Sequence, residues 1–192
     1  KAITEMDSAK TAEQFLTVAN KFERIALAEK NQWLPYYYSA LSRTTATFIS
    51  QNTAEIDAIL DVAQKHINVA DSLMPNNSEI VLMKGMILGG RIMVDPMSRG
   101  MQFGMQSSML TSQAMTLDPN NPRSYLMMGQ SLFYTPEQFG GGKEKGCVQL
   151  QIAKEKFGIF IPASSLHPNW GKEMMEETLK QCLTETQPEK QD

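Results

Sequence analysis

The sequence predicts an all-α protein in which helices follow one another in pairs. Along almost every segment between turn signals, apolar residues recur at spacings of three and four, which is the period of an amphipathic helix. No segment sustains the strict alternation of apolar and polar residues that is typical of a half-buried strand. Clusters of Pro, Gly and Asn divide the chain into helix-length segments, and such clusters are typical of turns.

Composition limits the classes of function. The 192 residues, 42% of them hydrophobic, can bury a sizeable core in one domain or one short helical array. A formal net charge of −3 gives no basic surface of the kind that binds nucleic acid. The most hydrophobic segment, 80–94, is interrupted by Lys84 and Arg91, so no stretch predicts a membrane span. We therefore expect neither a membrane span nor a nucleic-acid partner, and the oligomeric state stays open.

The first expected helix covers residues 11–29. Thr11 fits the N-cap position, and Gln14, three residues later, completes the pattern of a capping box. The residues before Thr11 allow a further short helix. The second helix, 33–50, accepts Pro35 in its first turn, where the missing N–H of proline is tolerated.

The remaining helices follow from the same two signals, an apolar stripe and a terminating turn. Turns rich in proline and asparagine at 75–77 and 118–122, and a glycine-rich loop at 135–142, separate them. Asn169 is expected to cap the last helix. The expected helices after the first two are 53–73, 78–93, 98–117, 123–134, 143–157 and 169–183.

Two of the helix pairs share an internal repeat. Four positions of one unit recur 44 residues later, so that Ala63, Ile67, Ala70 and Pro75 correspond to Ser107, Thr111, Ala114 and Pro119. Six residues after each proline begins a similar run, with Gly85 in one unit and Gly129 in the other. We expect these glycines to let neighbouring helices approach closely, while larger apolar side chains fill the space alongside.

This pattern resembles the tetratricopeptide repeat, whose W-x-x-L-G-x-x-Y stretch matches the runs that contain Gly85 and Gly129. The resemblance implies a right-handed α-α superhelix of about three helix pairs, with an extra N-terminal helix and a C-terminal capping helix. We expect a single domain over 1–184 and a polar, disordered tail over 185–192. The period departs from the 34 residues of the family, and the extra residues, including 95–100, are expected to lengthen the first helix and the loop after it.

A closer resemblance is to exported tetratricopeptide proteins of Bacteroidetes-type bacteria, and it rests on the runs 33–38, 139–143 and 167–171. It implies that Lys1 follows a signal-peptide cleavage site and that the protein works in the periplasm or cell envelope. A cytoplasmic location is the alternative. The loop 139–143 is also similar to the periplasmic T component of TRAP-type transporters. That likeness gives a transporter-accessory or small-ligand-binding module as the alternative function.

No constellation of residues predicts an enzyme. Only His66 and His167 could act as a general base near neutral pH, and neither belongs to a catalytic motif. We interpret His66 as a solvated surface residue, and we predict no catalytic residue, cofactor or bound metal. The two cysteines, Cys147 and Cys182, allow two interpretations: two buried thiols, or one bridge between neighbouring helices.

Three further features have two interpretations each. The glycines before Lys143 could present N–H groups to an anion, but the spacing is not that of a P-loop, and we expect instead a tight turn that buries Phe139. Carboxylates at helical spacing, such as Asp57 and Asp61, are expected on a solvated face. The 14 methionines either line an adaptable groove or fill the core, and we expect most of them to fill the core.

The leading functional prediction is a non-enzymatic scaffold that binds another protein or a peptide. Stacked helix pairs form a concave surface that is lined by the first helix of each pair. Its mixture of aromatic, apolar and single charged groups suits an extended peptide. The groove positions implied by the tetratricopeptide family are Tyr37, Leu41, Glu79, Leu82, Met86, Arg123, Leu126, Gln130 and Phe133.

Overall fold

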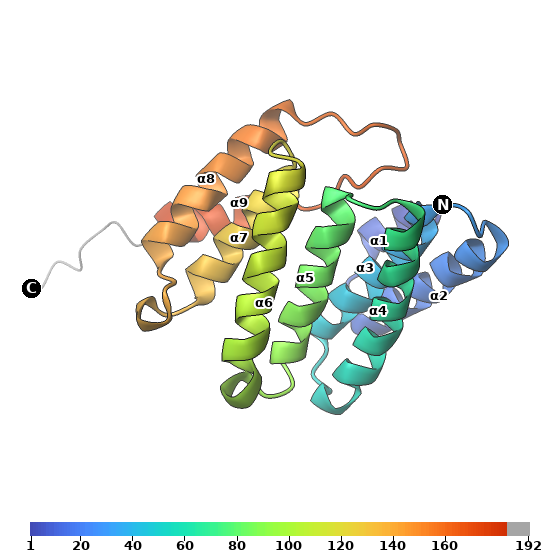
Figure 1. The fold of residues 1–192 in the computed structure, drawn as a ribbon, viewed down its shortest axis with the longest axis horizontal. Helices are drawn as coiled ribbons and strands as arrows, with labels where there is room; N and C mark the ends of the chain where they lie inside the picture. The colour runs from blue at the N-terminus through green and yellow to red at the C-terminus, as the bar shows by residue number, and fades with distance from the viewer. Residues whose placement is uncertain (184–192) are drawn as a thin grey trace, which may run out of the picture. The chain divides into compact units, whose positions relative to one another are not determined.

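The structure, a computed structural model, describes residues 1–183 and is all-α over that range, as predicted (Figure 1). Nine α-helices follow one another in these residues, and within each of the two units described below sequence neighbours pack together. They are α1 (Ala2–Ser8), α2 (Ala12–Ala28), α3 (Trp33–Ile49), α4 (Ile56–Leu73), α5 (Ser78–Ile92), α6 (Pro96–Leu117), α7 (Pro122–Tyr134), α8 (Lys143–Ile159) and α9 (Lys172–Leu183). Two single 3-10 turns, Thr53–Glu55 and Glu137–Phe139, precede α4 and α8.

The helices form two compact units. Unit 1, Lys1–Leu117, contains α1 to α6, and unit 2, Asp118–Asp192, contains α7 to α9. The single domain expected over 1–184 stays a prediction, as does a superhelix across both units. The tail expected over 185–192 lies outside the described residues.

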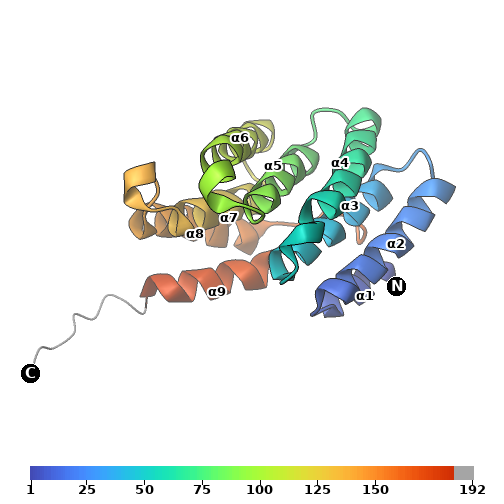
Figure 2. The ribbon, with the colours of Figure 1, turned by 90° about the horizontal axis from the view of Figure 1, so that it is seen from below.

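In unit 1 each helix lies beside the next one in the sequence. Figure 2 shows α2, α3, α4, α5 and α6 following one another in this order. α3 packs against α2, α4 and α5, and for this reason every residue from Tyr36 to Thr44 is buried. Aromatic side chains make contacts both between and within these helices. The ring of Tyr38 stacks on Phe22 of α2, and Tyr37 packs edge-on against Trp33 of α3 itself.

Local signals set several helix starts. The capping box of α2 is present as predicted: the Gln14 amide N–H donates to the Thr11 hydroxyl at 3.2 Å, and the Gln14 side chain accepts from the Thr11 amide. The short helix allowed before it is α1. At α5 the Asn77 side chain accepts hydrogen bonds from the amides of Glu79 and Ile80. Each of these caps satisfies amides that the helix itself leaves unpaired.

Residues 95–100 were expected to lengthen the loop between two helices, but most of them belong to the second helix, which was expected to start at Ser98. α6 begins at Pro96, where proline needs no N–H partner and fits the first turn. The carboxylate of Asp95 accepts a hydrogen bond from the amide of Ser98 at 3.2 Å, which satisfies an amide of that first turn. The additional residues of this repeat therefore lengthen α6 and leave the loop short.

The start of the last helix also differs from the prediction. α9 begins after Gly171 and not at Asn169. Gly171 has a φ of +102°, a conformation that favours glycine, and a Cβ there would lie 2.9 Å from Cδ2 of Leu126. The close approach to α7 therefore decides where the helix starts, and this tertiary contact has no local sequence signal.

In unit 2, α7 and α8 lie very close together because glycine occupies the contact points. A Cβ on Gly129 would lie 2.8 Å from Cγ of Leu150, and one on Gly146 would lie 2.6 Å from the backbone nitrogen of Phe133. The expected role of Gly129 is thus confirmed. Gly85 of unit 1 acts in the same way, since a Cβ there would lie 3.2 Å from a backbone oxygen of α6.

α9 completes the core of unit 2. Its Met175 joins a buried apolar cluster whose other members are Leu126, Leu150 and Ala153. A disulfide between Cys147 of α8 and Cys182 of α9 joins the two helices, with their Cα atoms 5.9 Å apart. Of the two interpretations of the cysteines, the disulfide bridge is therefore confirmed and the pair of buried thiols is wrong.

Candidate functional site

The predicted groove residues of unit 1 are buried. Tyr37 and Leu82 have no exposed surface, and Leu41, Glu79 and Met86 have little. The hydroxyl of Tyr37 donates a hydrogen bond to the carboxylate of Glu79 at 3.2 Å, so these two polar side chains hold α3 to α5. In this conformation they stabilise the unit and offer a peptide little surface.

The groove residues predicted on α7 belong to unit 2. Arg123 and Leu126 are buried, and the guanidinium of Arg123 lies 4.5 Å from the ring centroid of Phe160. Gln130 and Phe133 are half-buried, and the Gln130 amide donates to the hydroxyl of Thr178 at 3.0 Å. Since the predicted groove spans both units, it stays a prediction.

The glycine-rich loop is a packed turn, but it does not bury its aromatic residue. Phe139 is 67% exposed, so its expected burial is wrong. The amide of Gly142 donates to the carbonyls of Leu132 and Thr135 at 3.0 and 2.9 Å, and that of Gly140 donates to Glu137. These N–H groups are used inside the loop, which favours the turn over an anion site.

His66 is not the solvated residue that we expected. Its side chain is only 14% exposed, and its Nδ1 lies 2.9 Å from the hydroxyl of Ser39. Arg43, itself buried, also contacts Ser39 and forms an ion pair with Glu23. Burial lowers the pKa of His66, and the nearby Arg43 lowers it further, whereas Glu23 raises it. This cluster is a satisfied polar network between α2, α3 and α4.

The carboxylates of α4 are ion-paired and not merely solvated. Asp57 pairs with both Arg91 and Arg99, at 3.2 and 2.8 Å, and Asp61 pairs with Arg91 at 2.6 Å. They border an open hollow of about 420 Å³, and a second hollow of about 550 Å³ lies between α1 and α2. Charged side chains line much of both hollows, and Ala2, Ile25 and Ala28 add apolar surface to the one between α1 and α2.

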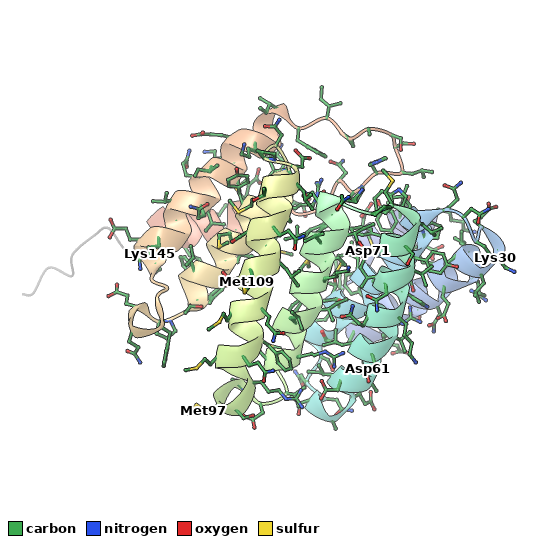
Figure 3. All side chains as sticks on the ribbon, viewed as in Figure 1. Lys30, Asp61, Asp71, Met97, Met109 and Lys145 are labelled. Atoms are coloured by element: carbon green, nitrogen blue, oxygen red, sulfur yellow. A yellow bond between two sulfur atoms is a disulfide. The ribbon has the colours of Figure 1, made fainter. Side chains whose placement is uncertain are left out.

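Four exposed methionines lie on α6. Four methionines are spaced four residues apart and therefore share one face, which we call the methionine face. Their exposed fractions are 95% for Met97, 77% for Met101, 62% for Met105 and 67% for Met109. Figure 3 labels Met97 near the start of α6 and Met109 further along it.

The methionine face carries no charge. Arg99 is the one ionisable residue in the 22 residues of α6, and both carboxylate oxygens of Asp57 accept hydrogen bonds from it. The opposite side of α6 is buried through Thr111 and Ala114, and Ser107 donates a hydrogen bond to the backbone of α5 at 2.8 Å. An exposed helix usually has charged residues on its solvent side, so this face is suited to cover an apolar ligand.

Sequence reasoning missed this face because it treated the methionines as one group. Met83 and Met86 of α5 do fill the core, as expected. Met105 and Met109 do not. The signal that separates them was present, because the α6 methionines recur every fourth residue in a segment with a single charge, whereas the apolar residues of α5 surround the whole helix.

Comparison with known proteins places the chain in a family. No protein-family model matches it, and no curated protein matches it. Among solved structures, it is similar to the "HusA haemophore from Porphyromonas gingivalis", with 32% sequence identity and a TM-score of 0.87. The match covers 100% of this chain and 94% of that chain. The chain belongs to the HusA haemophore family.

Membership of the HusA family bears on two of the expectations. The all-α fold of paired helices is confirmed, but the fold is HusA-like, and the finer assignment to the tetratricopeptide family is not supported by a family model. A haemophore is a binding protein, which agrees with the expectation of a non-enzymatic function. None of the described helices is long and apolar enough to cross a membrane.

Proposed function

We propose that this protein is a non-enzymatic haem-binding protein that captures haem outside the cytoplasm. The observation that carries the proposal is its relationship to the HusA haemophore, which extends over the whole chain at 32% identity. The relationship extends over all nine described helices, and this extent supports the proposal.

The methionine face is the surface that we propose for haem. From Met97 to Met109 it extends for about 18 Å along the helix, since each residue adds about 1.5 Å. A porphyrin is flat and largely apolar. Its transfer from water to an apolar surface is therefore favourable. Unbranched thioether side chains adapt their shape to such a ligand, and no charge on this face opposes its binding.

The disulfide supports a location outside the cytoplasm. Bridges such as Cys147–Cys182 persist in oxidising compartments and are rare where thiols are kept reduced. The periplasm or cell envelope, implied by the resemblance to exported proteins, is the location that we propose.

The peptide-binding scaffold remains the second hypothesis. Burial of Tyr37, Leu82 and Leu126 leaves few groove anchors for a peptide, whereas the methionine face is exposed. We therefore place haem capture first. A haem receptor or a haem-carrying protein would be the protein partner under this proposal.

Titration of the purified protein with haem, followed by the Soret band, tests the proposal. We expect saturable binding that weakens by about tenfold or more when Met101 and Met105 are both replaced by Glu, because charges then oppose burial of the macrocycle. Met74→Glu is the matched control, since Met74 is 46% exposed and lies outside α6. Wild-type protein that shows no saturable haem binding would contradict the proposed function.

A further inference from the structure

α9 is held on the α7–α8 pair by three noncovalent contacts and by the disulfide. At its start, Gly171 packs against Leu126. Further along, Met175 is buried in the core of unit 2, and the amide of Gln130 donates to the hydroxyl of Thr178 at 3.0 Å. The other residues of α9, which packs against α8 (Figure 2), are partly or fully exposed. A helix of this length is marginal in water by itself, so α9 depends on these contacts and on the disulfide.

The helix pair beneath α9 has contacts of its own. α7 and α8 approach each other closely at Gly129 and Gly146, and the atoms that these two glycines meet belong to Leu150 and Phe133, not to α9. The ammonium group of Lys143 on α8 also lies 5.4 Å from the ring centroid of Phe133 on α7. We therefore expect α7 and α8 to stay packed together when α9 moves away.

The segment 160–171, which connects α8 to α9, allows such a movement. It contains no helix or strand, and its Ile161 and Leu166 are 86% and 58% exposed. Extended, a segment of this length spans about 40 Å, whereas α9 is about 18 Å long. α9 can thus leave its place without displacing α8.

The disulfide lies where it controls this movement. Cys147 is in the first half of α8, and Cys182 is in the last turn of α9, so the bond fixes the end of α9 that is farther from Gly171. Both cysteines are half-buried, and Val148 and Gln181 beside them are exposed. A small dithiol or the active site of a dithiol protein can therefore reach the sulfur atoms.

We propose that α9 is a redox-controlled lid, which the disulfide holds on the α7–α8 pair and which a dithiol reductant releases. The dithiol attacks as a thiolate and passes through a mixed disulfide. The bond between Cys147 and Cys182 breaks, the two cysteines become thiols by taking up two electrons and two protons from the dithiol, and the dithiol becomes a disulfide. Release of Met175 then uncovers the apolar side chains of Leu126 and Leu150. This inference does not depend on haem binding.

Hydrogen exchange of the full chain, followed by mass spectrometry with and without excess dithiothreitol, tests the lid. Amides of a helix that opens locally exchange faster than those of its neighbours. On reduction we expect the protection of α9 to fall at least about tenfold further than that of α7 and α8, because the bond no longer restrains α9. The mass of the intact protein verifies that the disulfide is reduced.

The double variant Cys147→Ser/Cys182→Ser is the matched control. Its α9 should exchange as fast as that of the reduced wild type, and dithiothreitol should have no further effect on it. Protection of α9 that is the same in oxidised and reduced wild type would overturn the inference. An equal loss of protection in α7, α8 and α9 would also overturn it, because unit 2 would then open as one block and α9 would not be a separate lid.

Discussion

At the scale of single residues, His66 links pH to stability. Burial and the neighbouring Arg43 lower the pKa of His66 below its ordinary value of 6.5, so the folded protein favours the neutral ring. The unfolded chain therefore binds more protons between the lowered pKa and about 6.5. We expect the stability that comes from the neutral His66 to be fully present above that range. The free energy of unfolding should then decrease as the pH falls through the range. Urea unfolding at pH 7.5 and at successively lower values measures this decrease.

The variant His66→Gln supplies the comparison. Glutamine can still form a hydrogen bond with Ser39 but does not titrate. In the variant, the free energy of unfolding should therefore change less steeply with pH between pH 7 and the lowered pKa of His66. Glu5 and Asp95 also have lowered pKa values, but from ordinary values near 4, and they act at lower pH. An identical slope in wild type and variant would show that another group is responsible.

At the scale of helices, the close contact of α7 and α8 depends on glycine. A Cβ at Gly146 would lie 2.6 Å from the backbone nitrogen and 2.7 Å from the Cα of Phe133, and backbone atoms cannot move aside cheaply. We expect Gly146→Ala to destabilise unit 2 by about 1–3 kcal/mol through overpacking. Urea unfolding followed by circular dichroism measures the loss.

Gly158 in the same helix is the matched control. A Cβ there would meet nothing within 4 Å, so Gly158→Ala should be neutral, or stabilising by up to about 1 kcal/mol through helix propensity. Equal effects at the two positions would mean that the loss does not come from the contact with Phe133.

Helix ends that depend on local chemistry could be predicted from the sequence, and those that depend on packing could not. The cap at Thr11 uses residues within one turn, so the capping box was predicted correctly. The start of α9 depends on Gly171 against Leu126, which lies 45 residues earlier, and no local signal reveals it. The groove shows the same limit, since helical periodicity identifies an apolar face on α3 but not that all sides of α3 are covered.

At the scale of the whole molecule, the disulfide lies entirely within unit 2. Cys147 and Cys182 are 35 residues apart in the sequence, and closing a loop of that size stabilises a fold by about 2–4 kcal/mol. Replacing both cysteines by Ser should therefore lower the stability of unit 2 and have a smaller effect on unit 1.

The two tryptophans can report on the two units separately. Trp33 lies in α3 of unit 1, and Trp170 packs against the core of unit 2. Fluorescence of Trp170→Phe and Trp33→Phe proteins during unfolding follows one unit at a time. We expect the double Ser substitution to shift the transition reported by Trp170 more than that reported by Trp33. Equal shifts would show that the two units unfold as one cooperative block.

The exposure of the methionine face also has a chemical consequence. Peroxide converts accessible thioethers to sulfoxides, and a sulfoxide is polar where methionine is apolar. Met97 and Met101 are the most exposed methionines of the described chain, and they would be oxidised before the buried Met83. Because haem itself promotes peroxide chemistry, the surface that we propose for its capture is also open to oxidative damage, and sulfoxide reductases would be the enzymes that restore it.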